Sequence, residues 1–247
     1  MTARKRKRYL IVNADDFGQS SGVSRGIIEA HEHGIVTSAS LMVRWPAAAE
    51  AAAYGRKHPS LGLGLHFDFG EWCCRNGSWI KLYEVVSEED VTAVSKEVSR
   101  QLAAFRRLVG KDPTHLDSHQ HVHCRRPLRS VFIDVAEKLR VSLRFFSAQV
   151  RYRWGFYGQT RDGEPRPDFI SAAALIKMLA KLPPGFTELG CHPGYAEDLD
   201  SMYQQERVRE LRTLCNPRVR TAINHMGIEL CSFRDVVLRE QEGSPCK

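Results

Sequence analysis

The sequence lacks any hydrophobic run close to the roughly 20 residues that a membrane-spanning helix requires. Its basic start, ARKRKR, leads only into the short apolar stretch YLIVNA, and no site typical of signal-peptide cleavage follows. The chain therefore shows no feature of a membrane or exported protein, and we expect a cytoplasmic location and no membrane partner.

Two groups of short motifs are also missing. The seven cysteines include the adjacent Cys73 and Cys74, the others are scattered, and no CxxC motif occurs. This spacing argues against a zinc ribbon or a disulfide framework and fits reduced thiols. Neither GxGxxG nor the P-loop pattern follows an apolar run, so the phosphate-binding versions of α/β folds lose support.

The excess of positive charge is concentrated at one end of the chain. The formal net charge is +7, but about five of the positive charges fall in residues 4–8, ahead of the first apolar segment. No aromatic residues alternate with these charges, so they predict a solvated tail rather than a nucleic-acid contact. We expect a disordered basic tail over residues 1–8, a single domain over residues 9–240 and a flexible tail over residues 241–247.

Short apolar segments alternate with longer amphipathic ones along the rest of the chain. The segments with strand character are residues 9–14, 36–43, 61–67, 114–117, 141–146, 186–191 and 228–232. The helical patterns start at a cap at Ser20 or Ser21 and at Pro46, and continue with residues 91–109, 128–139, 170–182, 202–214 and 217–226. This alternation predicts an α/β fold with about seven parallel strands, either a (β/α) barrel or a doubly wound sheet.

Ionisable residues follow four of these predicted strands. They are the pair Asp15 and Asp16, then His66, then the segment 117–123, and finally His192. The carboxyl ends of parallel strands share one face, and this face carries the active site in barrels. We therefore expect these residues to converge, although they are far apart in the sequence.

The motif NADDFG, residues 13–18, places two carboxylates side by side at a strand end. One interpretation is structural, an Asx turn that caps the following helix. The other is chemical, because two neighbouring carboxylates that point into one site repel each other, and a cation relieves this repulsion. In that case one carboxylate binds the cation and the other can accept a proton.

The stretch THLDSHQHVH, residues 114–123, contains four histidines and one aspartate. In an extended chain the aspartate and the last three histidines point to one side, whereas in a helix His119 and His123 share a face. In both cases one or two histidines can reach a common metal, and one of them completes an Asp/His/His set with His66. Three protein ligands leave positions open for water, as in hydrolytic sites. His115 has the opposite parity and is interpreted as a packed histidine.

Two further histidines lie at strand ends. His66 closes the segment GLGLHF, where the glycines allow close backbone approach. His192 precedes a Pro-Gly turn in GCHPGY. Because imidazole titrates near neutral pH, His192 is a candidate general acid that donates a proton to a leaving amine. Taken alone, each of these histidines also fits a turn or packing role.

Taken in order, LIVNADDFG, GIIEAHEHGIVTSASLMV, GLGLHF, PTHLDSHQHVH and ELGCHPGY resemble the YdjC-like carbohydrate deacetylases, a family that includes chito-oligosaccharide deacetylase. The similarity extends through nearly the whole chain. It implies a single-domain (β/α) barrel-like fold related to polysaccharide deacetylases. It also implies a hydrolase that removes an N-acetyl group from an amino sugar or oligosaccharide with one divalent metal ion.

The resemblance also assigns roles to individual residues. It implies Asp16, His66 and His119 as metal ligands, Asp15 as the general base and His192 as the general acid. Two imidazoles and one carboxylate suit Zn²⁺ by softness, whereas the family is associated with Mg²⁺, so both ions are considered. Relatives commonly pair, which makes a homodimer an expectation here.

The expected substrate is an N-acetylated amino sugar. The side chains expected near it are Asp117, His121 and His123, which could orient ligands or the sugar, together with Trp154 and Tyr157 from the aromatic and arginine-rich segment 151–167. Two alternatives are open. A metal-dependent phosphoesterase would use similar clusters but with two metals. A sugar-binding relative without activity would not need both Asp15 and Asp16.

Overall fold

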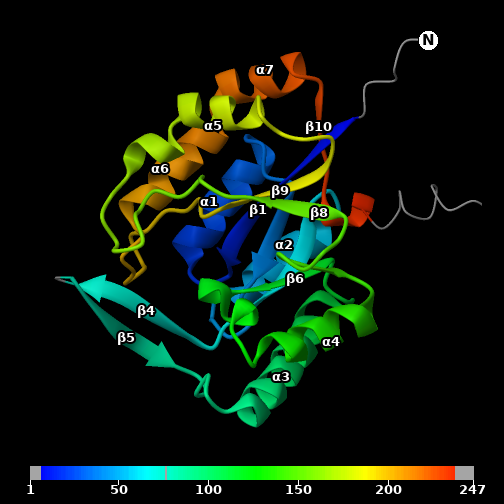
Figure 1. The fold of residues 1–247 in the computed structure, drawn as a ribbon, viewed down its shortest axis with the longest axis vertical. Coiled ribbons are helices and arrows are strands. Elements are labelled where there is room, and N and C mark those ends of the chain that lie inside the picture. The colour runs from blue at the N-terminus through cyan, green and yellow to red at the C-terminus, as the bar shows by residue number, and fades with distance from the viewer. Residues whose placement is uncertain (1–6, 76, 237–247) are drawn as a thin grey trace, which may run out of the picture.

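The computed structural model describes residues 7–75 and 77–236 (Figure 1). The strands are β1 (Arg8–Phe17), β2 (Ser38–Leu41), β3 (Gly62–Phe67), β4 (Gly70–Arg75), β5 (Ser78–Glu84), β6 (His115–Ser118), β7 (Ser142–Leu143), β8 (Val150–Arg153), β9 (Gly185–Cys191) and β10 (Ile228–Leu230). The helices are α1 (Ser21–Glu32), α2 (Ala48–Lys57), α3 (Val91–Val109), α4 (Arg129–Leu139), α5 (Ala172–Leu179), α6 (Gln205–Leu214) and α7 (Pro217–His225), with short 3-10 helices η1 (His119–Cys124) and η2 (Pro167–Ile170).

The expected tails fall mostly beyond the described residues. Residues 1–6 of the basic tail and all of residues 241–247 lie outside them. Arg8 was assigned to the tail but already begins β1, where it pairs with both Gly185 and Ile228. The folded domain therefore starts slightly earlier than residue 9.

Seven strands form one parallel sheet in the order β7-β6-β3-β2-β1-β9-β8, and β10 pairs with the start of β1. The sheet curls into a nearly closed barrel with helices around it (Figure 1). β1 lies in the middle of the order and is buried from Leu10 to Phe17. This arrangement confirms the (β/α) barrel-like prediction, because helical crossovers between parallel strands place the helices outside the sheet.

The barrel strands depart from the predicted ones at two places. β8 was not predicted, since its sequence VRYR carries two arginines, but it pairs in parallel with β9 from Val150 to Arg153. The strand predicted at residues 141–146 is shorter in the structure and covers only Ser142–Leu143. The chain turns there, because Phe145 has a left-handed φ of 68° and the Phe146 amide donates to the Leu143 carbonyl.

An antiparallel hairpin made of β4 and β5 follows β3, and it was also not predicted. It projects from the body of the barrel in Figure 1, and most of β5 is at least partly exposed. Its inner strand, β4, is largely buried at Gly70, Glu71 and Cys73. The hairpin therefore adds a wall beyond the rim of the barrel.

Helix boundaries follow from capping residues. The Ser20 side chain accepts the Val23 amide hydrogen at the start of α1, as predicted. Asp90 caps α3 in the same way, and Gly110, with a φ of 79°, ends it. The Ala-rich helix predicted from Pro46 begins only at Ala48.

The hydrophobic core lies between the barrel and the helices. One continuous cluster includes Val12 of β1, Ile27 of α1, Leu63 of β3 and Phe105 of α3. In the part of the chain that the structure describes, no helix is both long and apolar enough to cross a membrane.

Candidate metal and catalytic site

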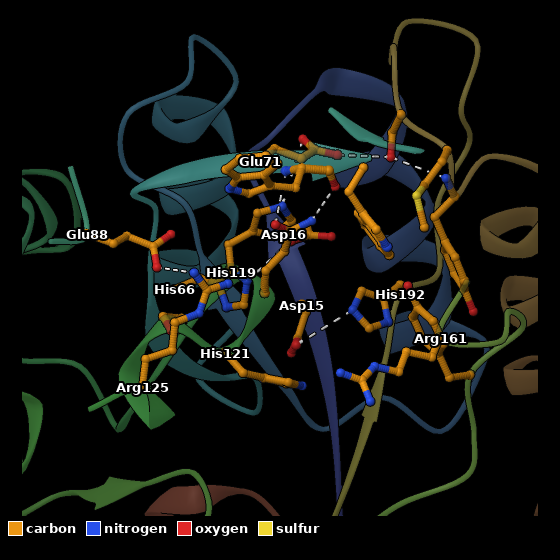
Figure 2. Close-up of a pocket in the computed structure, with 18 of the residues that line it drawn as sticks. Asp15, Asp16, His66, Glu71, Glu88, His119, His121, Arg125, Arg161 and His192 are labelled. Carbon is orange, nitrogen blue, oxygen red and sulfur yellow. Dashed lines mark hydrogen bonds and ion pairs between the residues drawn. The ribbon is translucent and has the colours of Figure 1, made fainter. Parts of the chain in front are cut away.

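A cavity of about 1110 Å³ opens where the barrel strands end. Figure 2 shows side chains from four separate segments around it: Asp15 and Asp16 of β1, His66 of β3, His119 after β6 and His192 after β9. The β4–β5 hairpin and residues 152–161 supply further walls. The structure thus brings together the five residues that the sequence analysis singled out for metal binding and catalysis.

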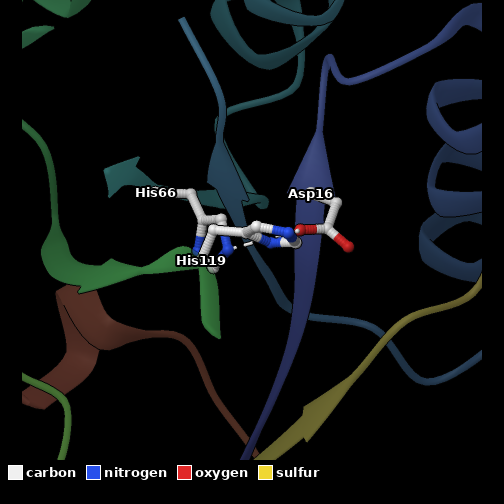
Figure 3. A group of neighbouring side chains, drawn as sticks. All are labelled: Asp16, His66 and His119. Atoms are coloured by element: carbon white, nitrogen blue, oxygen red, sulfur yellow. Dashed lines mark hydrogen bonds and ion pairs between the residues drawn. The ribbon is translucent and has the colours of Figure 1, made fainter. Parts of the chain in front are cut away.

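Asp16, His66 and His119 form a compact group within this cavity (Figure 3). Asp16 Oδ1 lies 3.3 Å from Nε2 of His66 and 3.1 Å from Nδ1 of His119. One candidate ligand atom from each residue lies within 4.8 Å of the other two. These three side chains could therefore bind a single metal ion.

An irregularity in β1 brings both aspartates to the cavity. Successive side chains of a regular strand point to opposite faces. Here the register between β1 and β2 shifts between Ala14 and Phe17, and Asp16 has a φ of 66°. This left-handed conformation is uncommon for a residue other than glycine, and it interrupts the alternation of the strand. Consecutive carboxylates can consequently serve one site.

Of the four histidines in residues 114–123, the conformation of the loop after β6 places His119 next to Asp16. Neither an extended chain nor a regular helix is present, because Gln120 and His121 both have left-handed φ angles, of 49° and 56°. Nδ1 of His119 lies 3.1 Å from Asp16. The ring of His121 instead packs edge-on against Phe145, with 5.1 Å between the ring centroids. His115 stacks on Phe233 at 3.9 Å and is buried, as expected for a packed histidine.

Asp117 and His123 were expected near the substrate, but both are fully buried and neither lines the cavity. Asp117 Oδ1 lies 2.7 Å from Nδ1 of His66. His123 hydrogen-bonds with the Ser118 hydroxyl at 2.7 Å. Direct substrate contact is therefore not supported for these two residues, whereas the carboxylate of Asp117 can hold the ring of His66 in place.

Asp15 is bound by a buried arginine that the sequence analysis missed. Arg144 donates to both carboxylate oxygens of Asp15, at 2.6 and 2.7 Å, and Asn13 donates to one of them at 2.8 Å. The same guanidinium lies 2.8 Å from Asp117 and 2.7 Å from Glu188. Burial alone would raise the pKa of Asp15, but the attraction and hydrogen bonds of Arg144 lower it, so Asp15 is ionised at neutral pH.

The Asp16/His66/His119 group attracts positive charge. Burial alone would raise the pKa of Asp16, but Arg207, which donates to its Oδ2 at 2.6 Å, and His119 hold that pKa well below its usual range. Burial alone would lower the pKa of both imidazoles. The Asp117 carboxylate nevertheless raises the pKa of His66 to about 10, and Asp16 raises that of His119. The carboxylates that raise the pKa of the two imidazoles would also attract a metal cation to their nitrogens.

His192 faces Asp15 from the other side of the cavity (Figure 2). Its Nε2 lies 3.8 Å from Asp15 Oδ2, and its backbone amide donates to Glu210 at 2.5 Å. Burial lowers the pKa of His192 to about 4, so the ring is neutral at neutral pH. The ring packs against two tyrosine rings, with centroid distances of 5.6 Å to Tyr157 and 5.5 Å to Tyr203. No described residue hydrogen-bonds with its Nδ1, although this atom is buried.

Aromatic side chains form the outer part of the cavity. His121, Trp154 and Tyr157 line it as expected, together with Trp72, Trp79 and Phe156. Trp154 stacks on Phe145 at 4.8 Å and is still 61% exposed. One face of this ring is therefore packed and the other is accessible.

The sequence analysis missed Arg144, Arg207 and Glu71, which all contact the site. Arg144 is the one charged residue in the mostly apolar segment 141–146, and a charge at such a position was a usable signal. Arg207 lies in an amphipathic helix, where an arginine is ordinary. Glu71 belongs to the hairpin that was not predicted, and its Oε2 lies 3.8 Å from Nε2 of His119.

Two known proteins are similar to this chain over nearly its whole length. A carbohydrate deacetylase from Geobacillus stearothermophilus is 35% identical, over 92% of this chain and 98% of the relative. A chitooligosaccharide deacetylase from Serratia marcescens is 32% identical, over 93% of this chain and 100% of the relative.

Solved structures share the fold. A protein from Enterococcus faecalis V583, described as a cellobiose-phosphate cleavage protein, superposes with a TM-score of 0.76 and 26% identity, over 93% of this chain and 99% of that one. A family 4 carbohydrate esterase from Streptomyces lividans has a TM-score of 0.53 with 14% identity, over 92% of each chain, and shows the same fold. The model of the YdjC-like protein family matches residues 9–225, and the chain therefore belongs to this family.

Proposed function

We propose that the protein is a metal-dependent N-deacetylase, which hydrolyses the acetamide group of an amino sugar and releases acetate. The observation that carries this proposal is one cavity that holds a buried Asp16/His66/His119 group beside a second carboxylate, Asp15, and a histidine, His192. The names of the two relatives, carbohydrate deacetylase and chitooligosaccharide deacetylase, support the same class of reaction.

The donor set fits one divalent ion. Nδ1 of His66 is hydrogen-bonded to Asp117, which leaves its Nε2 free to bind a metal. Oδ1 of Asp16 lies next to both imidazoles. Asp16, His66 and His119 would hold Zn²⁺ or Mg²⁺, and three protein ligands leave room for water and substrate. The ion supplies Lewis acidity, which lowers the pKa of a water molecule and polarises the acetamide carbonyl.

Asp15 serves as the general base in this proposal. A carboxylate offers about four acceptor positions, and Arg144 and Asn13 occupy three of them. The fourth lies on Oδ2, the oxygen that faces His192. Because its lowered pKa keeps Asp15 ionised, this position is available to take a proton from water as it attacks the acetamide carbon.

His192 serves as the general acid and receives its proton during the reaction. With a pKa of about 4 the free ring carries no extra proton at neutral pH. Asp15 Oδ2 lies 3.8 Å from Nε2, so the proton that Asp15 removes from water can pass to His192. His192 then donates it to the departing amine as the C–N bond breaks, which leaves acetate and a free amino sugar.

The walls of the cavity suit a sugar. Trp154, Tyr157 and His121 present rings to it, and Tyr157 is itself held by stacking on Tyr203 at 4.5 Å. Ligand sites combine such apolar surfaces with a few fixed polar groups. We therefore assign these three residues to substrate contact, and an N-acetylated amino sugar as the substrate.

The phosphoesterase alternative is less well supported. It would use two metals, and the other candidate group in the described residues, Asp15, His66 and Asp117, shares His66 with the first. Both of its carboxylates are bound to Arg144. A guanidinium therefore occupies the position that a second cation would need.

The proposed function is tested by incubating the protein with a panel of N-acetylated sugars and measuring loss of an acetyl group by mass spectrometry. We expect loss from at least one sugar when Zn²⁺ or Mg²⁺ is supplied and none after chelation. Release of phosphate from phosphorylated sugars without acetate would favour the phosphoesterase. Binding without either product would favour a sugar-binding protein. Light scattering of the same samples tests the expected homodimer.

A further inference from the structure

Glu71 is a buried carboxylate at the cavity to which the proposed function gives no role. It belongs to β4 of the hairpin and not to a barrel strand, yet only 5% of the residue is exposed. Its Oε2 lies 3.8 Å from Nε2 of His119. A carboxylate at this depth is costly unless it is paired or hydrogen-bonded.

The two histidines of the metal group have matching surroundings. His66 lies between Asp16, 3.3 Å from its Nε2, and Asp117, 2.7 Å from its Nδ1. His119 lies between Asp16, 3.1 Å from its Nδ1, and Glu71, 3.8 Å from its Nε2. Each imidazole therefore turns one nitrogen to the shared Asp16 oxygen and the other to a second carboxylate.

The Nε2 atom of His119 lacks another partner. It is buried, and no described residue forms a hydrogen bond with it. Buried ring nitrogens are usually paired, and Glu71 is the carboxylate within reach. Metal-binding histidines almost always donate their second N–H to a carboxylate, a carbonyl or water, which fixes the tautomer and the ring orientation.

The hairpin is attached to the histidine loop directly beside this pair. The side chain of Gln120, which follows His119, accepts the Trp72 amide hydrogen at 3.0 Å and donates to the Trp72 carbonyl at 2.6 Å. The Ser201 hydroxyl donates to the other oxygen of Glu71 at 3.3 Å. The position of Glu71 next to His119 is therefore fixed by the Trp72–Gln120 hydrogen bonds beside it and by its own hydrogen bond from Ser201.

We infer that Glu71 is a positioning residue of the metal site, which accepts the Nε2 hydrogen of His119 and so leaves Nδ1 for the metal. This inference rests on the proposed metal group of Asp16, His66 and His119. It makes the hairpin, which lies outside the barrel, a part of the metal site. Glu71 itself does not bind the ion.

The test compares metal affinity of the full chain in Glu71→Gln, Glu71→Ala and the matched control Glu84→Gln. Glu84 lies on the same hairpin and lines the cavity, but its carboxylate pairs with Lys81 at 2.5 Å. Co²⁺ and Zn²⁺ are titrated calorimetrically, and the visible spectrum of the Co²⁺ form reports its ligands. Glu71→Gln is nearly isosteric, so it keeps the test possible if Glu71→Ala fails to fold.

We expect both Glu71 variants to bind metal about 10- to 100-fold more weakly, with an unchanged Co²⁺ spectrum, while Glu84→Gln binds normally. Unchanged affinity in both Glu71 variants would overturn the inference. So would a changed Co²⁺ spectrum in Glu71→Gln, which would make Glu71 a ligand. Because metal binding is measured without substrate, a failed deacetylase assay would leave this result standing.

Discussion

Arg144 and Asp15 form a bidentate ion pair in the interior of the barrel, with hydrogen bonds of 2.6 and 2.7 Å between two side chains that are almost fully buried. This geometry fixes the plane of the Asp15 carboxylate and directs its remaining acceptor position to the cavity. The orientation of the proposed base therefore depends on a residue from a distant segment, the turn that follows β7.

Replacing Asp15 with Asn should abolish most turnover without loss of metal. The amide cannot accept the proton from water, and positioned proton transfer contributes about 10²- to 10⁴-fold to catalysis. Asp15 does not belong to the group of Asp16, His66 and His119, so metal content should stay close to that of the wild type. Acetate release and bound metal are measured on the same preparation. Wild-type rates from Asp15→Asn would exclude Asp15 as the base.

Replacing Arg144 with Met should destabilise the fold. The change leaves Asp15, Asp117 and Glu188 without their shared cation, and breaking a buried ion pair costs about 3–5 kcal/mol. Urea denaturation measures the free energy of unfolding. The control is Arg151→Met, because Arg151 is exposed and the one hydrogen bond of its side chain within the described residues goes to the Pro184 carbonyl. Surface changes usually stay within about 0.5 kcal/mol. Equal stability of the two variants would contradict this prediction.

Replacing His119 with Ala should remove the bound metal, whereas His121→Ala should retain it. The two histidines are separated by a single residue, but only His119 faces Asp16, at 3.1 Å. His121 lies against Phe145 and Trp154 instead. Metal content after dialysis, measured by atomic emission, separates the two variants. Full metal content in His119→Ala would refute the ligand set.

The metal-free protein should lose stability as the pH rises above neutrality. Burial opposes protonation of His66, but Asp117 raises its pKa to about 10 from an ordinary value of 6.5. A group whose pKa is raised by folding contributes its full stability below its unfolded pKa and loses it as the pH rises through the folded pKa. The loss between about pH 6.5 and 10 should be on the order of a few kcal/mol, measured by urea denaturation in chelator. His66→Gln should show a flatter pH dependence, and an identical slope would argue against this assignment.

Much of the fold and of the candidate site could be predicted, because both follow from periodicity. The alternation of apolar and amphipathic segments predicted a parallel sheet, in either a barrel or a doubly wound fold, and the family resemblance pointed to the barrel. The polar residues after the strands predicted that Asp15, Asp16, His66, the segment 117–123 and His192 converge, since strand ends share a face. The family resemblance then pointed to His119 within that segment. The packing of His115 followed from its parity in the strand.

The remaining features depend on contacts between distant segments or on exceptions to regular geometry. The left-handed residues Asp16, Gln120 and His121 decide which side chains reach the site, and no periodic pattern reveals such angles. The pairing of Arg144 with three carboxylates and the approach of Glu71 to His119 exist only after the chain has folded. Asp117 and His123 were expected to orient metal ligands or the sugar. Both side chains are fully buried, and only Asp117 contacts a candidate ligand, His66.

Arg144 also joins the proposed base to the metal group, because it contacts both Asp15 and Asp117, and Asp117 contacts His66. A proton gained or lost at any of these groups changes the field felt by the others, and interacting groups titrate with pKa values that belong to the set. The inflections of a pH–rate profile should therefore shift together when one member is changed. In this protein the proposed base and the candidate metal ligands form one electrostatic unit.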